Sequence, residues 1–159
     1  MSMSVMSRRL LLGAGLGITI IAAAPRHLSA AGATLRVLKA RGCGCCDLWV
    51  AHLRDNGFTC AVEEYADLTP LKDRLGVPAQ LRSCHTALLD EYVIERHVPA
   101  LALTHLLTRR PPFAGLAVPG MPTGSPGMPG EPVEEYAVIA FNRTGQGEVF
   151  MRFAGERAI

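Results

Sequence analysis

Three of the five cysteines in this chain of 159 residues lie within four positions, at Cys43, Cys45 and Cys46. Gly42 and Gly44 interrupt the segment, so the backbone there can curl and bring several sulfur atoms to one side. Cysteines that serve only as packing residues usually occur singly on apolar faces, and adjacent cysteines cannot easily join in a disulfide without strain. The cluster therefore indicates metal binding, thiol redox chemistry, or both.

The predicted domain, residues 34–159, combines strands and helices and includes two hairpins, over residues 86–95 and 136–153. Thr69 followed by Pro70 is typical of a helix start, with Thr as the N-cap and Pro in the first turn. Residues 111–132 hold seven of the 11 prolines and five of the 16 glycines, so we expect a long loop there. The apolar periodicity predicts strands at 34–39, 58–63, 86–89, 92–95, 136–141 and 148–153, and helices at 47–56, 69–75 and 99–109. This order indicates an α/β fold with a mixed central sheet and about three helices.

The N-terminal segment, residues 1–33, has the layout of an export signal. Arg8 and Arg9 precede an apolar run over residues 10–24, which is shorter than the roughly 20 residues that a membrane-spanning helix needs. The arginine pair followed by leucines resembles a twin-arginine signal, with cleavage expected after Ala33 or a few residues earlier. We therefore expect a periplasmic protein with no stable membrane span after cleavage; an uncleaved anchor helix is the alternative.

The charge balance argues against nucleic acid as a partner. Three of the 16 basic residues and none of the 14 acidic residues lie in residues 1–33, so the remainder of the chain is close to neutral. A nucleic-acid-binding domain normally carries a clear basic excess. No general acid–base pair, nucleophilic serine site or phosphate-binding glycine loop stands out, so metal binding is favoured and enzymatic activity is left open.

A Cys-x-x-Cys pair, Cys43 and Cys46, directly precedes the first predicted helix, an arrangement that resembles the thioredoxin architecture. Amide groups and the dipole at a helix N-terminus favour thiolates, which are both nucleophiles and soft metal ligands. In the thioredoxin architecture the loop before the third strand packs against this helix start, and here that loop carries Cys84 and His85. Cys60 shares the expected buried face of its predicted strand with Phe58 and Val62, and is expected in the core. The donors expected to converge are Cys43, Cys45, Cys46, Cys84 and His85.

Such a sulfur-rich donor set selects Cu(I), zinc or an iron–sulfur cluster. Met121 and Met128 offer thioethers, which suit Cu(I), and the cysteine spacing differs from the usual iron–sulfur motifs. Four close thiolates can also bridge more than one Cu(I) ion, so the sequence allows a multinuclear cluster. His52, His97 and the two methionines stay open as further ligands, because packing explains each of them at least as well.

From about residue 35 to residue 153 the sequence resembles the CopG-type copper-resistance proteins, a thioredoxin-like group long described only as a domain of unknown function. The resemblance rests on Gly-Cys-Gly-Cys-Cys at 42–46, Trp-Val-Ala-His-Leu at 49–53, Gly-Phe at 57–58, Leu-Gly-Val-Pro at 75–78, Ser-Cys-His-Thr-Ala at 83–87, Tyr-Val-Ile-Glu-Arg-His-Val-Pro at 92–99, Gly-Leu-Ala-Val-Pro-Gly-Met-Pro at 115–122 and Gly-Ser-Pro-Gly-Met at 124–128. It implies a periplasmic copper-handling protein with a role in interconverting Cu(I) and Cu(II). The metal ligands that it implies are Cys43, Cys45, Cys46 and Cys84, with His85 nearby. Copper ions and other periplasmic copper carriers or efflux components are the expected partners.

Two other functions stay open. A thiol–disulfide oxidoreductase needs only Cys43 and Cys46, but it leaves Cys45, Cys84 and the methionines without a role. In that enzyme class a cis-proline normally stands where Cys84 and His85 stand here. A structural zinc site needs only four sulfur or nitrogen ligands. Copper binding is the hypothesis that accounts for all the clustered donors.

Overall fold

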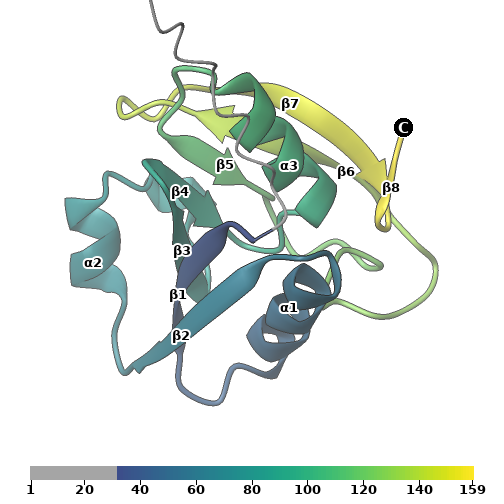
Figure 1. Ribbon diagram of the computed structural model, residues 1–159, viewed down its shortest axis with the longest axis horizontal. Helices are drawn as coiled ribbons and strands as arrows, with labels where there is room; N and C mark the ends of the chain where they lie inside the picture. The colour runs from purple at the N-terminus through teal and green to yellow at the C-terminus, as the bar shows by residue number, and fades with distance from the viewer. Residues whose placement is uncertain (1–31) are drawn as a thin grey trace, which may run out of the picture.

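The structure, a computed structural model, describes residues 32–159, an α/β domain built on one eight-stranded mixed sheet (Figure 1). The strands lie in the order β2-β1-β3-β4-β5-β6-β7-β8. β1 pairs with β2 and β4 with β5 in parallel, whereas the other neighbours are antiparallel. In chain order the elements are β1 (Thr34–Ala40), α1 (Gly44–Asp55), β2 (Thr59–Tyr65), α2 (Thr69–Arg74), the 3-10 helix η1 (Ala79–Leu81), β3 (His85–Leu89), β4 (Tyr92–Glu95), α3 (Ala100–Arg109), β5 (Gly115–Ala117), β6 (Glu135–Phe141), β7 (Gly147–Ala154) and β8 (Arg157–Ala158). The predicted mixed sheet with three α-helices is confirmed for the described residues.

Helices cover both faces of the sheet. α1 and α3 share one face, where Trp49 of α1 and Leu103 of α3 are fully buried in the larger apolar cluster. On the other face, Val77 and Leu81, around η1, pack with Phe141 of β6 in a smaller cluster. Figure 1 shows α2 across the sheet from α1. The sheet is thus buried on both sides around its central strands, which fixes the strand ends that carry the candidate site.

The register of the central strands determines where that site lies. β1 pairs with β3 so that Lys39 is opposite His85, and the N–H of Ala40 donates to the carbonyl of Cys84 at 2.8 Å. Cys84 therefore lies beside the end of β1, where the chain turns into the cysteine segment and α1. β3 and β4 form the predicted hairpin, so the residues that follow Glu95 return to the same end of the sheet.

Two helix starts differ from the prediction. α1 begins at Gly44, three residues earlier than expected, because Cys43 adopts an extended N-cap conformation and its carbonyl accepts the N–H of Asp47. The last two cysteines of the cluster therefore lie within the first turn of the helix. Thr69 is the first residue of α2 and not its N-cap, since the carboxylate of Asp67 accepts the Thr69 N–H at 2.8 Å.

Two strand predictions also need correction. Val62 was expected on the buried face of its strand, but it is 37% exposed, because β2 is the edge strand and the core covers only its first half. Residues 111–132 are not one loop, because they contain β5, paired between β4 and β6. β5 passes so close to β4 that a Cβ on Gly115 would overlap the carbonyl oxygen of Val93. A three-residue strand among prolines leaves no periodic pattern.

The expected export signal at residues 1–33 lies outside the described residues except for its last two positions. Along residues 32–159 we find no helix with the length and apolar character needed to span a membrane. The likeness to the thioredoxin architecture stays a prediction.

Candidate metal centre

The cysteine segment is held at the N-terminus of α1. Cys43 is the N-cap residue, and Cys45 and Cys46 lie in the first turn. Gly42 has a φ of +67°, a left-handed conformation that suits glycine and turns the chain from β1 into the helix. The cysteine segment therefore lies at the end of the helix whose amide groups have no partners within the helix.

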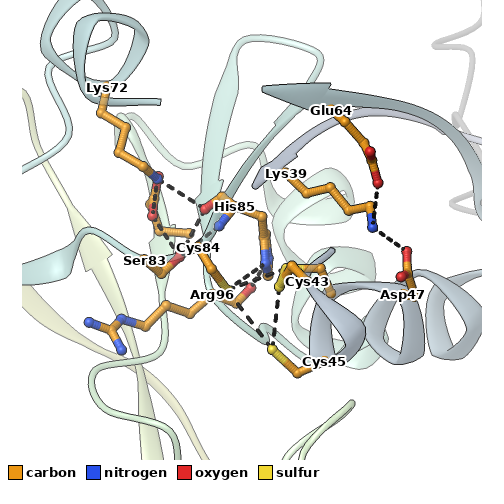
Figure 2. Close-up of a disulfide and its surroundings, with 12 residues drawn as sticks. Lys39, Cys43, Cys45, Asp47, Glu64, Lys72, Ser83, Cys84, His85 and Arg96 are labelled. Carbon is orange, nitrogen blue, oxygen red and sulfur yellow. Dashed lines mark hydrogen bonds and ion pairs between the residues drawn. A yellow bond between two sulfur atoms is a disulfide. The ribbon is translucent and has the colours of Figure 1, made fainter. Parts of the chain in front are cut away.

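Four sulfur atoms converge at this helix end (Figure 2). The Sγ of Cys84 lies 3.3 Å from that of Cys46 and 4.0 Å from that of Cys45. The Sγ of Cys45 lies 3.5 Å from that of Cys43. All four sulfurs lie within 4.8 Å of one another. The structure thus brings together the four cysteines that the sequence singled out from two distant segments.

Cys43 and Cys46 are joined by a disulfide, so the structure shows an oxidised form of the site. Cys45 and Cys84 are free and half-buried. Cys60 is free and buried on β2, as expected for a core residue, and lies outside the sulfur group. In this form two thiols of the group can bind metal, and reduction of the disulfide would make four available.

The Cys84 thiol is held in its protonated form. Burial, followed by the neighbouring Cys45, raises the pKa of Cys84 to about 11. A metal ion that binds Cys84 at neutral pH must therefore displace a proton.

His85 lies next to the sulfur group and is fully buried. Its ring stacks on Trp49, with centroids 4.4 Å apart, and lies nearly parallel to the ring of His97, with centroids 5.4 Å apart. The Nε2–H of His85 donates to the carbonyl of Arg96 at 2.8 Å, which leaves Nδ1 unprotonated and 4.0 Å from Cys84 Sγ. Burial, followed by His97, lowers the pKa of His85 to about 3. A neutral imidazole of fixed tautomer is the form that binds metal ions.

A buried ion pair holds the segment that carries Cys84 (Figure 2). Lys72 Nζ lies 2.7 and 2.9 Å from the two carboxylate oxygens of Glu95 and donates to the carbonyl of His85 at 3.1 Å. Ser83 Oγ lies 3.0 Å from Glu95 Oε2 and 2.8 Å from the same carbonyl. Burial lowers the pKa of Lys72, and the negative charge of Glu95 opposes this effect. The residues on both sides of Cys84 are thus fixed by side chains from α2 and β4.

A cavity of 210 Å³ opens beside the sulfurs. Cys45, Cys84, His97 and Met121 are among its lining residues. Met121 belongs to the loop between β5 and β6, residues 118–134, and its side chain is 53% exposed at the cavity. Met128, in the same loop, does not line this cavity. An ion can reach the sulfurs through this cavity, where it passes the thioether of Met121.

Comparisons with known proteins add to this geometry. Two solved structures, named copper resistance protein CopG in forms 1 and 2, are each 40% identical to this chain. Form 1 aligns with a TM-score of 0.72 over 78% of this chain and 99% of its own. Form 2 aligns with a TM-score of 0.71 over 77% and 98%, respectively. The chain belongs to the CopG family. A family described as "Protein of unknown function, DUF411" matches residues 81–128 of this chain, and a search of curated proteins gave no match.

The sequence left His52 and His97 of this CopG-family chain open as further metal ligands. The structure places only one of them beside the sulfurs. His52 lies away from the sulfurs: its Nε2 accepts the N–H of Ala100 at 3.1 Å at the start of α3, and its Nδ1 pairs with Glu156. His97 lies beside His85 and lines the cavity. The predicted hairpin could have indicated that His97 lies near His85. Because the hairpin pairs Thr86 with Glu95, residues 85 and 97 lie at the same end of its two strands.

Proposed function

We propose that this protein is an exported copper-resistance protein that binds Cu(I) through Cys43, Cys45, Cys46 and Cys84, with His85 beside them. A metal ion bound to four sulfurs at about 2.3 Å separates those sulfurs by about 3.8 Å in a tetrahedron. Outside the Cys43–Cys46 disulfide, sulfur separations of 3.3, 3.5 and 4.0 Å bracket that value. This convergence of sulfurs is the observation that carries the proposal.

Copper is favoured over zinc by the chemistry around the sulfurs. Thiolates bind both metals, but a thioether suits Cu(I), and Met121 adds a thioether to the lining of the cavity. The two solved relatives are named for copper resistance. Since a thiolate can bridge two soft ions, four sulfurs this close support a cluster of several Cu(I) ions.

The disulfide supports a redox role within the same proposal. Two Cu(II) ions and the thiols of Cys43 and Cys46 give two Cu(I) ions, the disulfide and two protons. One electron passes to each copper, and the S–S bond forms as the two S–H protons leave. The disulfide in the structure corresponds to the product of that reaction.

The test is metal analysis after anaerobic loading of the reduced protein with Cu(I), with free thiols counted before and after. We expect one or more coppers per chain, with the four clustered thiols protected by copper and Cys60 unaffected by it. Cys84→Ser should lose copper, while Cys60→Ser, the matched control outside the sulfur group, should retain it. Undiminished copper in Cys84→Ser would contradict the proposal, and zinc in the purified protein together with unfolding by chelators would favour the structural zinc site.

A thiol–disulfide oxidoreductase is the second candidate, and the Cys43–Cys46 disulfide is the observation that favours it. That activity needs only these two sulfurs. We expect the reductase activity of the protein to be absent or weak. Strong activity that survives both Cys45→Ser and Cys84→Ser, in a protein that retains no copper, would favour the oxidoreductase.

Export through residues 1–33 to the periplasm is part of the proposal. Replacing Arg8 and Arg9 together by lysine should retain the protein in the cytoplasm if the twin-arginine route carries it. Cell fractionation gives the answer, and unchanged export of the double variant would contradict that route.

A further inference from the structure

Cys84 belongs to a second donor group. One donor atom from each of Cys84, His85 and His97 lies within 4.8 Å of the others. This group shares only Cys84 with the four-cysteine group, and both of its imidazoles are buried. The two donor groups therefore meet at one sulfur but differ in chemistry, since one is all sulfur and the other is mostly nitrogen.

His97 carries a polar atom that the fold leaves unused. In residues 32–159 its Nδ1 is a buried side-chain nitrogen without a hydrogen-bond partner, and the residue is only 4% exposed. A buried polar group without a partner is destabilising, because folding removes its hydrogen bond to water. A bound ligand would remove that penalty, and His97 lines the cavity beside Cys84 through which an ion could arrive.

His85 has the orientation of a metal-binding histidine. Such residues almost always donate the second ring N–H to a carboxylate or a backbone carbonyl. His85 donates its Nε2–H to the carbonyl of Arg96, so the lone pair of Nδ1 points to the Cys84 thiol, 4.0 Å away. Burial also lowers the pKa of His97 to about 4, so both rings stay neutral and able to bind an ion at physiological pH.

The disulfide changes which donors are available. When Cys43 and Cys46 are joined, the soft four-thiolate set no longer exists, whereas Cys84 and both imidazoles are unaffected. Imidazole nitrogens suit borderline divalent ions, and among first-row divalent metals Cu(II) generally binds most tightly. We propose that, in the disulfide form, Cys84, His85 and His97 bind a divalent copper ion at a nitrogen-containing subsite that shares Cys84 with the Cu(I) site. The identity of the metal rests on the proposed function.

The test uses the full chain in its disulfide form, verified by mass, and Co(II) as the probe. Co(II) replaces Cu(II) in the titration because an excess of dissolved Cu(II) can oxidise free thiols such as that of Cys45, whereas Co(II) does not. We expect one Co(II) per chain with thiolate-to-cobalt absorption, and loss of that absorption in Cys84→Ser. His97→Gln and His85→Gln should each weaken binding about tenfold or more, while His105→Gln, on α3 outside the group, should leave binding unchanged. Binding by His97→Gln equal to that of the wild type, or absence of the absorption in the wild type, would overturn the subsite.

A second measurement avoids substitution, in case a histidine variant fails to fold. Nitrogen NMR of the histidine rings in the wild-type disulfide form, titrated with Zn(II), should show shifts for His85 and His97 and none for His52 or His105. Shifts confined to other histidines would contradict the proposal.

Cu(I) loading of reduced His97→Gln separates the two proposals. Full Cu(I) capacity together with weakened Co(II) binding supports a subsite distinct from the four-cysteine site. If the reduced wild type takes up no Cu(I) but the disulfide form binds Co(II) as expected, the proposed function fails and the subsite stands. Equal loss of both metals in a folded variant would show one undivided site and overturn the subsite.

Discussion

Gly127 lies against the backbone of Cys45: a Cβ on Gly127 would come 2.6 Å from the Cys45 carbonyl oxygen and 2.9 Å from the Trp49 nitrogen. The loop between β5 and β6 therefore lies directly on the first turn of α1, where two of the clustered cysteines are. Gly127 also has a φ of +84°, which L-residues with side chains rarely adopt. Glycine at this position sets how closely the loop that carries Met121 can approach the sulfurs.

Gly127→Ala should both destabilise the protein and disturb the metal centre. The left-handed backbone strain costs about 1 kcal/mol, and the overlap with α1 adds about 1–3 kcal/mol. We also expect faster alkylation of Cys45 and weaker Cu(I) retention, because the first turn of α1 must shift. Urea unfolding and thiol alkylation rates measure the two effects.

Gly145→Ala is the matched control for this prediction. Gly145 also has a φ of +84°, but a Cβ there would meet only Pro78, at an ordinary 3.9 Å. It should therefore show the backbone strain with no effect on Cys45 or on copper. Equal losses of stability and unchanged Cys45 reactivity in both variants would show that the contact between the loop and α1 has no influence on the site.

Lys72→Met should cost about 3–5 kcal/mol of unfolding free energy, because it leaves the carboxylate of Glu95 buried and unpaired. The double variant Lys72→Met/Glu95→Gln removes both charges and should recover most of that loss. Both variants remove the hydrogen bond from Lys72 to the His85 carbonyl, so both should bind copper less tightly than the wild type. Chemical denaturation and copper competition measure the two quantities, and a single variant as stable as the double one would contradict the ion-pair argument.

The parts of the site that could be predicted from the sequence are those that strand order determines. A Cys-rich segment after the first strand and a Cys-His pair before the third meet because β1 and β3 are neighbours, with Lys39 opposite His85. The core position of Cys60 followed from simple alternation. These inferences need only two facts: side chains alternate between the two faces of a strand, and the ends of neighbouring strands lie close together. Local sequence patterns indicate where the strands are.

The features that sequence analysis missed depend on tertiary contacts. β5 exists because Gly115 allows a close approach to Val93, and the exposure of Val62 follows from its place on an edge strand. The orphaned nitrogen of His97 is visible only once the packing around the ring is known. The early start of α1 arises from the backbone conformation of Cys43, which the neighbouring glycines did not reveal.

His52→Ala tests whether this histidine stabilises the fold without binding the metal. Its Nε2 accepts the N–H of Ala100 at the start of α3, a capping role that is worth about 1 kcal/mol. We expect that loss of stability in thermal or urea unfolding, with copper stoichiometry unchanged. Copper loss in a folded His52→Ala protein would mean that the helix contact hides a ligand role.

Copper uptake should release protons, because the pKa of Cys84 is raised to about 11 by burial and by Cys45. Below that pH the metal-free thiol keeps its proton, so Cu(I) affinity should rise with pH by about tenfold per unit for each proton displaced. The same shift in pKa makes the metal-free disulfide form lose stability as the pH rises from 9.0 to about 11, since the unfolded thiol ionises first. Competition with a Cu(I) chelator across pH gives the slope, and an affinity independent of pH would show that Cys84 is not a ligand.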